Sequence, residues 1–107
     1  MLSKKNRADK KVVEKIFKEG KFISSVCLTF KFISNVKSLT PRISFIAPKN
    51  IAKLAVKRNL LRRHGYIALA PYVKKFDHIS GVFVFKKYQD NISILENEIK
   101  DILHRIN

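Results

Sequence analysis

The sequence predicts an α+β domain in which helices pack on a mixed β-sheet. Apolar residues recur at helical spacing near both ends and in the middle of the chain, whereas the segments between them show a period of two. The resulting order is helix, strands, helix, strand, helix, with no internal repeat and no linker. Residues 1–107 fit a single domain, and 46% hydrophobic residues are enough to form a core.

The first helix is expected at about residues 9–19. Asp9 can cap its start, and Gly20 is placed to end it. Its apolar positions at helical spacing are Val12, Val13, Ile16 and Phe17.

Two strands are expected after this helix. Residues 22–33 alternate with a period of two and are rich in β-forming side chains, which predicts one long strand. A polar turn at residues 35–41 then leads to a second strand at 43–47, which Pro48 stops. We expect this second strand to pair antiparallel with the first.

A helical period resumes at about Ala52 and is ended or kinked by Pro71. Its narrow apolar stripe should be buried, and both flanks of the stripe are basic. The stripe consists of Leu54, Leu61, Gly65 and Ala68, with Leu69 beside them; one flank holds Arg58, Asn59 and Arg62, and the other holds Lys53, Lys57 and His64.

The last third of the chain predicts a strand and a helix. Residues 81–87 are apolar on both faces, which is typical of a central strand. Asp90 or Asn91 can cap the final helix. Its apolar face should contain Ile92, Leu95, Ile99, Ile102, Leu103 and Ile106, with the acids Glu96, Glu98 and Asp101 on the opposite face.

The charge distribution predicts a polyanionic partner. The chain has 23 Lys and Arg against 8 Asp and Glu, a net charge of +15, and no acid between Gly20 and Phe76. A surface with so many cations repels itself unless a polyanion neutralises it. Nucleic-acid binding is therefore the first hypothesis, with an ordinary solvated charged helix as the alternative.

The composition argues against a protein catalyst. Three scattered His lack metal-ligand spacing, three Gly are too few for a phosphate loop, and Cys27 is the only cysteine. We therefore expect no catalytic residue, no metal held by protein residues and no disulfide. No apolar run is long enough to span a membrane or to form a signal peptide, and a lone cysteine suits the reducing cytoplasm.

Several motifs together resemble the bacterial ribonuclease P protein component. Arg58-Asn59 match the first two positions of its Arg-Asn-Arg signature, and Arg62-Arg63 match the basic pair that follows. Lys49-Asn50 lies where that family has paired lysines. Residues 16–20, Ile-Phe-Lys-Glu-Gly, resemble the end of its first helix, and the basic residues 4–7 precede that helix.

The resemblance implies a compact α/β sandwich of αβββαβα order with a left-handed crossover through the basic helix. That order has one strand more than the periodicity shows, so residues 22–33 would be split or bent to supply it. The resemblance also implies that a catalytic RNA holds Mg²⁺ ions and removes the 5′ leader of precursor tRNA, and that the protein binds both RNAs.

The residues implied in these contacts fall into two groups. The expected RNA-binding residues are Lys49, Lys53, Lys57, Arg58, Asn59, Arg62 and Arg63, and the expected leader-binding residues are Val13, Phe17 and Lys31. A Phe at helical spacing is more often a core residue, so an inward-facing Phe17 stays open as an alternative.

This chain departs from the family pattern at several positions. Leu60 replaces the third residue of the signature, Asn50 replaces a Lys, and Val13 stands where the family usually has Phe. Lys31 lies near a strand position that can be aromatic. Two other functions stay open: a ribosomal or other structured-RNA-binding protein without a catalytic role, and a small DNA-binding module with the basic helix in the major groove.

Overall fold

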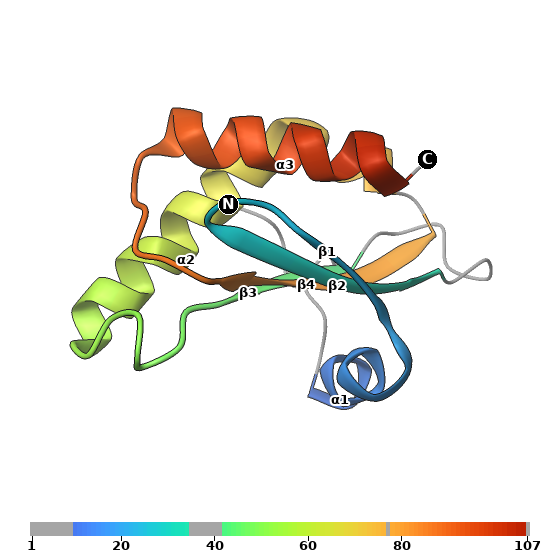
Figure 1. Ribbon diagram of the computed structural model, residues 1–107, viewed down its shortest axis with the longest axis horizontal. Coiled ribbons are helices and arrows are strands. Elements are labelled where there is room, and N and C mark those ends of the chain that lie inside the picture. The colour runs from blue at the N-terminus through green and yellow to red at the C-terminus, as the bar shows by residue number, and fades with distance from the viewer. Residues whose placement is uncertain (1–9, 35–41, 77, 107) are drawn as a thin grey trace.

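The computed structural model describes residues 10–34, 42–76 and 78–106, and the side chains of all of these except residues 10–13, 19 and 34. Three α-helices, one 3₁₀ helix and four strands follow one another in αβββαβα order, as the resemblance implied (Figure 1). The elements are α1 Lys10–Glu19, β1 Lys21–Ser24, β2 Leu28–Ser34, β3 Arg42–Ile46, α2 Ala55–Leu69, η2 Ala70–Phe76, β4 Ile79–Phe85 and α3 Ile92–Ile106.

The four strands form one mixed sheet in the order β1-β2-β4-β3. β2 pairs antiparallel with β1 and with β4, whereas β3 pairs parallel with β4. The expected antiparallel pairing of β3 with the strand before it is therefore wrong. β4 lies between β2 and β3. Nearly all of its side chains are buried, as expected of a strand that is covered on both faces. The parallel pair β3 and β4 is connected through α2.

The predicted long strand at 22–33 is two strands. β1 and β2 form a hairpin, whose turn is closed by a 2.7 Å bond from Ser25 N to Leu28 O. Val26 lies in this turn and is 66% exposed, although an unbroken alternation would place it on the same face as the buried Phe30 and Phe32. The split supplies the strand that the periodicity alone did not show.

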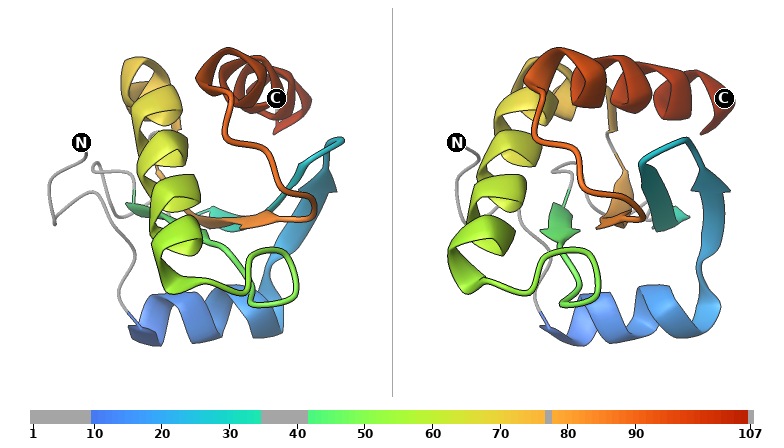
Figure 2. Two further views of the ribbon diagram at one scale, coloured as in Figure 1. Left: turned by 90° about the vertical axis from the view of Figure 1, so that its left-hand side faces the viewer. Right: turned by 60° about the vertical axis from the view of Figure 1, so that its left-hand side comes forward.

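The helices cover both faces of the sheet. α1 lies on one face, and α2 and α3 lie on the other (Figures 1 and 2). On the α2 and α3 face, Phe30, Phe83 and Phe45 stack across three strands, with ring centroids 4.3 Å and 4.9 Å apart. Gly65 lets α2 approach this row, since a Cβ there would lie 2.6 Å from the Phe45 ring.

The predicted buried stripe of α2 is largely confirmed. Leu61, Gly65, Ala68 and Leu69 are buried. Leu54 is not, because it precedes the first turn and is 63% exposed. The α-helix ends at Leu69, and the chain continues through Pro71 as η2.

Two predicted helix boundaries are confirmed, whereas the basic helix, expected from about Ala52, begins at Ala55. Gly20 N donates to Ile16 O at 2.8 Å and ends α1, and Asn91 Oδ1 accepts from Ile94 N at 3.1 Å at the start of α3. The central strand was placed two residues too late. The proposed cap Asp9 and the turn at 35–41 lie outside the described residues.

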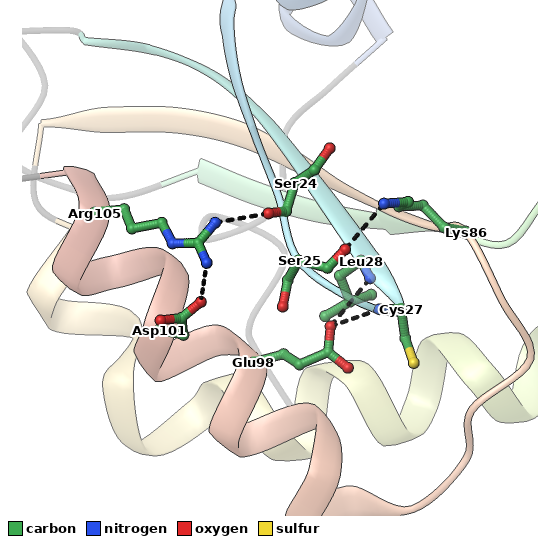
Figure 3. A network of polar contacts seen from close by, with 8 residues as sticks. All are labelled: Ser24, Ser25, Cys27, Leu28, Lys86, Glu98, Asp101 and Arg105. Carbon is green, nitrogen blue, oxygen red and sulfur yellow. Dashed lines mark hydrogen bonds and ion pairs between the residues drawn. The ribbon is translucent and has the colours of Figure 1, made fainter.

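α3 differs from its predicted pattern at one acid. Glu98 was expected on the solvent face, but it is only 8% exposed. Its Oε1 accepts from Cys27 N at 2.8 Å and from Leu28 N at 3.2 Å (Figure 3). The hairpin turn has two buried backbone donors that need an acceptor, and α3 supplies it.

Two cations complete the attachment of the hairpin turn. Lys86 Nζ donates to Ser25 O at 2.9 Å, and Arg105 Nη1 donates to Ser24 O at 2.8 Å (Figure 3). The guanidinium of Arg105 also pairs with Asp101 at 2.9 Å. These bonds come from α3 and the end of β4, so they fix the position of the edge strand β1.

Candidate nucleic-acid interface

The first half of α2 and the end of the loop before it present a basic surface, which we call the basic face of α2. The first turn of the helix contains no acid, and Leu54 at its N-cap offers no side-chain hydrogen bond. The partial positive charge of the helix start therefore adds to the cations around it. The exposed side chains of this face are Lys53, Lys57, Asn59, Arg62 and Arg63.

Arg58 belongs to this segment, but one nitrogen of its guanidinium makes hydrogen bonds within the domain. Its side chain is half-buried, and its Nη1 donates to Ala52 O at 3.0 Å and to Lys53 O at 2.8 Å. It thus fixes the loop that leads into α2. Lys49 lies exposed in the preceding turn, where Ile51 N and Ala52 N donate to Pro48 O.

Asn59 and Arg62 interact with each other on the exposed side of the helix. Arg62 Nη2 donates to Asn59 Oδ1, one turn away. The amide therefore orients the guanidinium, whose remaining donors face solvent and suit a phosphate.

Leu60 occupies an apolar position within the basic face. It is half-buried and, with Val56, Lys57, Asn59 and Arg63, it lines a shallow depression of about 260 Å³. Val56 is 69% exposed. The residue that replaces the third signature position therefore does not enter the core of the domain, and it separates two cations instead of adding a third.

Replacement of Leu60 by arginine is expected to strengthen RNA binding. The new guanidinium would lie between Lys57 and Arg63 and could reach one more phosphate, which steepens the plot of log affinity against log salt by about one. Binding to the catalytic RNA at several salt concentrations measures this. Leu60→Gln is the control for lost packing, and an equal gain with Gln would contradict an electrostatic cause.

A second surface lies beside α1 on the opposite face of the sheet from α2. Phe17 is 45% exposed, and Lys31 Nζ lies 4.6 Å from the centroid of its ring. The structure thus brings these two expected leader-binding residues together and rules out a buried Phe17. Val13 lies one turn before Phe17 on α1, but its side chain is outside the described part.

Phe22 lies next to this pair and was not among the residues expected from the sequence. It is 68% exposed and stands directly opposite Lys31 in the pairing of β1 with β2. In a single straight strand, Phe22 would share the buried face of Phe30 and Phe32. The hairpin reverses this relation, because it pairs even-numbered with odd-numbered residues.

The described residues form neither a metal site nor a reactive thiol. No three His, Cys, Asp or Glu side chains in residues 10–34, 42–76 and 78–106 are placed to hold a metal ion. Cys27 is buried, which raises the pKa of its thiol, and the neighbouring Glu98 raises it further. A protonated, covered thiol is a poor nucleophile. Within the same ranges, every helix is too short or too polar to cross a bilayer.

Comparison with known proteins identifies the family. The family model of ribonuclease P matches residues 2–107. The chain belongs to the ribonuclease P protein family. No curated protein sequence matches it.

Solved structures of ribonuclease P proteins share the fold. The Staphylococcus aureus protein superposes with a TM-score of 0.79 at 13% identity, over 94% of this chain and 93% of that one. The Thermotoga maritima protein superposes with a TM-score of 0.81 at 18% identity, over 94% and 97%. The ribonuclease P fold is therefore kept at low sequence identity.

Membership in the ribonuclease P family gives the chain its role as the protein subunit of this endoribonuclease and as a partner of the ribonuclease P RNA. The α+β architecture expected from the sequence is confirmed.

Proposed function

We propose that the subunit acts through two RNA-binding surfaces. The basic face of α2, with Lys49 and Arg58, binds the catalytic RNA, and the surface around Phe17 and Lys31 binds the 5′ leader of precursor tRNA. The observation that carries the proposal is the Lys31 ammonium over the half-exposed Phe17 ring. An aromatic face beside a cation suits a stacked base and its phosphate, which is how proteins hold single-stranded RNA.

The arrangement of the sheet supports two separate surfaces. α2 packs against β3, which is one edge of the sheet, whereas Lys31 lies on β2 at the other side of β4. Neighbouring strands are about 4.8 Å apart, so the two surfaces are roughly 10 Å or more from each other across the sheet. One subunit can then contact a catalytic RNA and a leader at the same time.

In this proposal the catalytic RNA, and not the protein, catalyses the cleavage of precursor tRNA. Mg²⁺ ions that activate water would be held mainly by the RNA, and the protein cations would screen phosphates around them. We do not expect the protein alone to cleave precursor tRNA. Residues 1–107 would act as one RNA-binding domain in the cytoplasm, where precursor tRNA is processed.

Replacement of Phe17 by alanine is expected to weaken binding of precursor tRNA by the reconstituted complex about five- to a hundredfold, the range for one lost base stack. Binding of mature tRNA, which lacks the leader, should be unchanged. The ring is half-exposed, so its loss should cost the fold little. Binding titrations with both tRNAs measure the difference, and equal losses for the two would contradict leader binding.

Reconstitution separates this function from the main alternative. The protein is mixed with a ribonuclease P RNA at low Mg²⁺, and cleavage of precursor tRNA is followed with and without it. Stimulation supports the proposal. No stimulation, together with tight binding to ribosomal RNA, would favour a structured-RNA-binding protein without a catalytic role.

A further inference from the structure

Three neighbouring side chains share the face of the sheet that carries α1. Phe17 projects from α1, Lys31 from β2 and Phe22 from the edge strand β1. Lys31 neighbours both aromatic residues: its ammonium is 4.6 Å from the Phe17 centroid, and its Cα is the cross-strand partner of Phe22. Directly paired side chains on neighbouring strands lie about 5 Å apart, so Phe22 is within reach of the same ligand.

The high exposure of the Phe22 ring indicates that it contacts a binding partner. At 68% it is nearly as exposed as the most exposed large apolar side chain of the described residues, Val56 at 69%. An exposed ring beside a half-exposed ring and a cation is typical of a binding surface. The hydroxyls of Ser24 and Thr29, 3.3 Å apart, continue the same face and can bond a ribose or a phosphate.

Charge complementarity indicates that this partner is RNA. β1, β2 and the turn between them contain no Asp or Glu, and Lys21 is exposed at the start of β1. One cation that neighbours two aromatic residues suits a single strand, in which a phosphate links two bases.

The position of Phe22 is also fixed before any RNA binds. β1 is an edge strand of only four residues, and such a strand would be loosely held by its single neighbour. Its end is instead bonded to α3 and to Lys86 through the hairpin turn (Figure 3). A platform that is rigid before binding loses less entropy when the ligand arrives.

We propose that Phe22 is a second base-stacking platform of the leader site. The site then holds two consecutive unpaired nucleotides, one base on Phe17 and one on Phe22, with the phosphate between them on Lys31. This inference rests on the proposed function, because it takes the leader as the RNA that binds this face.

The test uses the reconstituted complex and precursor tRNAs in which single leader nucleotides are abasic. With the wild-type protein, we expect two leader positions at which the abasic change weakens binding. With Phe22→Val, binding of the intact precursor should fall about five- to a hundredfold, and one of the two positions should lose its sensitivity. Valine keeps the β-propensity of the strand but has no ring. Phe22→Tyr keeps the ring and should bind as the wild type does.

The controls separate failure of this inference from failure of the proposed function. Tyr88→Val removes another exposed ring, in the loop between β4 and α3, and should have no effect. If Phe17→Ala weakens precursor binding but Phe22→Val leaves both abasic effects unchanged, the second platform is wrong and the leader site stands. If neither variant distinguishes precursor from mature tRNA, the leader site itself is wrong. Equal weakening of both tRNAs by Phe22→Val would place Phe22 against the catalytic RNA and overturn the inference.

Discussion

Replacement of Glu98 by alanine should lower the free energy of unfolding by about 2–4 kcal/mol. The variant leaves Cys27 N and Leu28 N without their shared acceptor in a buried place. An unsatisfied buried donor costs more than the net value of the bond that it made. Denaturant unfolding of the free protein measures the change.

A matched control for Glu98 lies one turn further along α3. Asp101 is also a carboxylate, but it pairs with Arg105 in solvent, and such exposed pairs contribute at most about 1 kcal/mol. Asp101→Ala should therefore have a small effect. Glu98→Gln keeps an oxygen that can accept both bonds and should cost less than alanine. Equal stability of Glu98→Ala and Asp101→Ala would show that Glu98 does not hold the hairpin.

Loss of Glu98 should also disturb the proposed leader site. The hairpin turn sets the position of β1, and β1 carries Phe22. We expect Glu98→Ala to weaken precursor binding more than mature tRNA binding under conditions in which the protein stays folded.

The double replacement of Arg62 and Arg63 by alanine should weaken binding to the catalytic RNA and flatten its salt dependence. Binding of the variant makes fewer phosphate contacts and therefore releases fewer counterions. The slope of log affinity against log salt should fall in magnitude by about one to two. Both side chains are exposed, so the fold should stay intact. Arg58 is less suitable for this test because its guanidinium bonds Ala52 O and Lys53 O.

Lys74 and Lys75 provide the control for the lost charge. They are exposed on η2, outside the basic face of α2, and their replacement by alanine removes the same two charges. If this control flattens the salt dependence as much as the arginine variant, the effect reflects the net charge of the protein. The basic face would then not be the docking surface.

Local patterns were sufficient for most elements of the fold. The helical spacing around Ile16, the alternation around Phe30 and the apolar run of β4 each depend on burial of one face or both, which a short stretch of sequence records directly. The cations on the two flanks of α2 were predictable for the same reason, because residues at helical spacing lie on the same flank of a helix.

Contacts between distant segments were not readable in this way. The pairing of β3 with β4 depends on a crossover through α2, and the partner of Glu98 is about seventy residues away in the chain. A carboxylate on the predicted polar side of α3 gives no local sign that it will accept bonds from a buried turn.

The sequence alone determined that this is a basic α+β domain with a cation-rich helix and a family signature around Arg58 and Asn59. Only the tertiary structure decided which side chains share a face across the sheet. The hairpin between β1 and β2 exchanges the parity of the two strands, which takes Phe22 away from the core and places it beside Lys31. Alternation fixes faces only within one strand, whereas the relation between strands depends on a turn that Glu98 holds from α3.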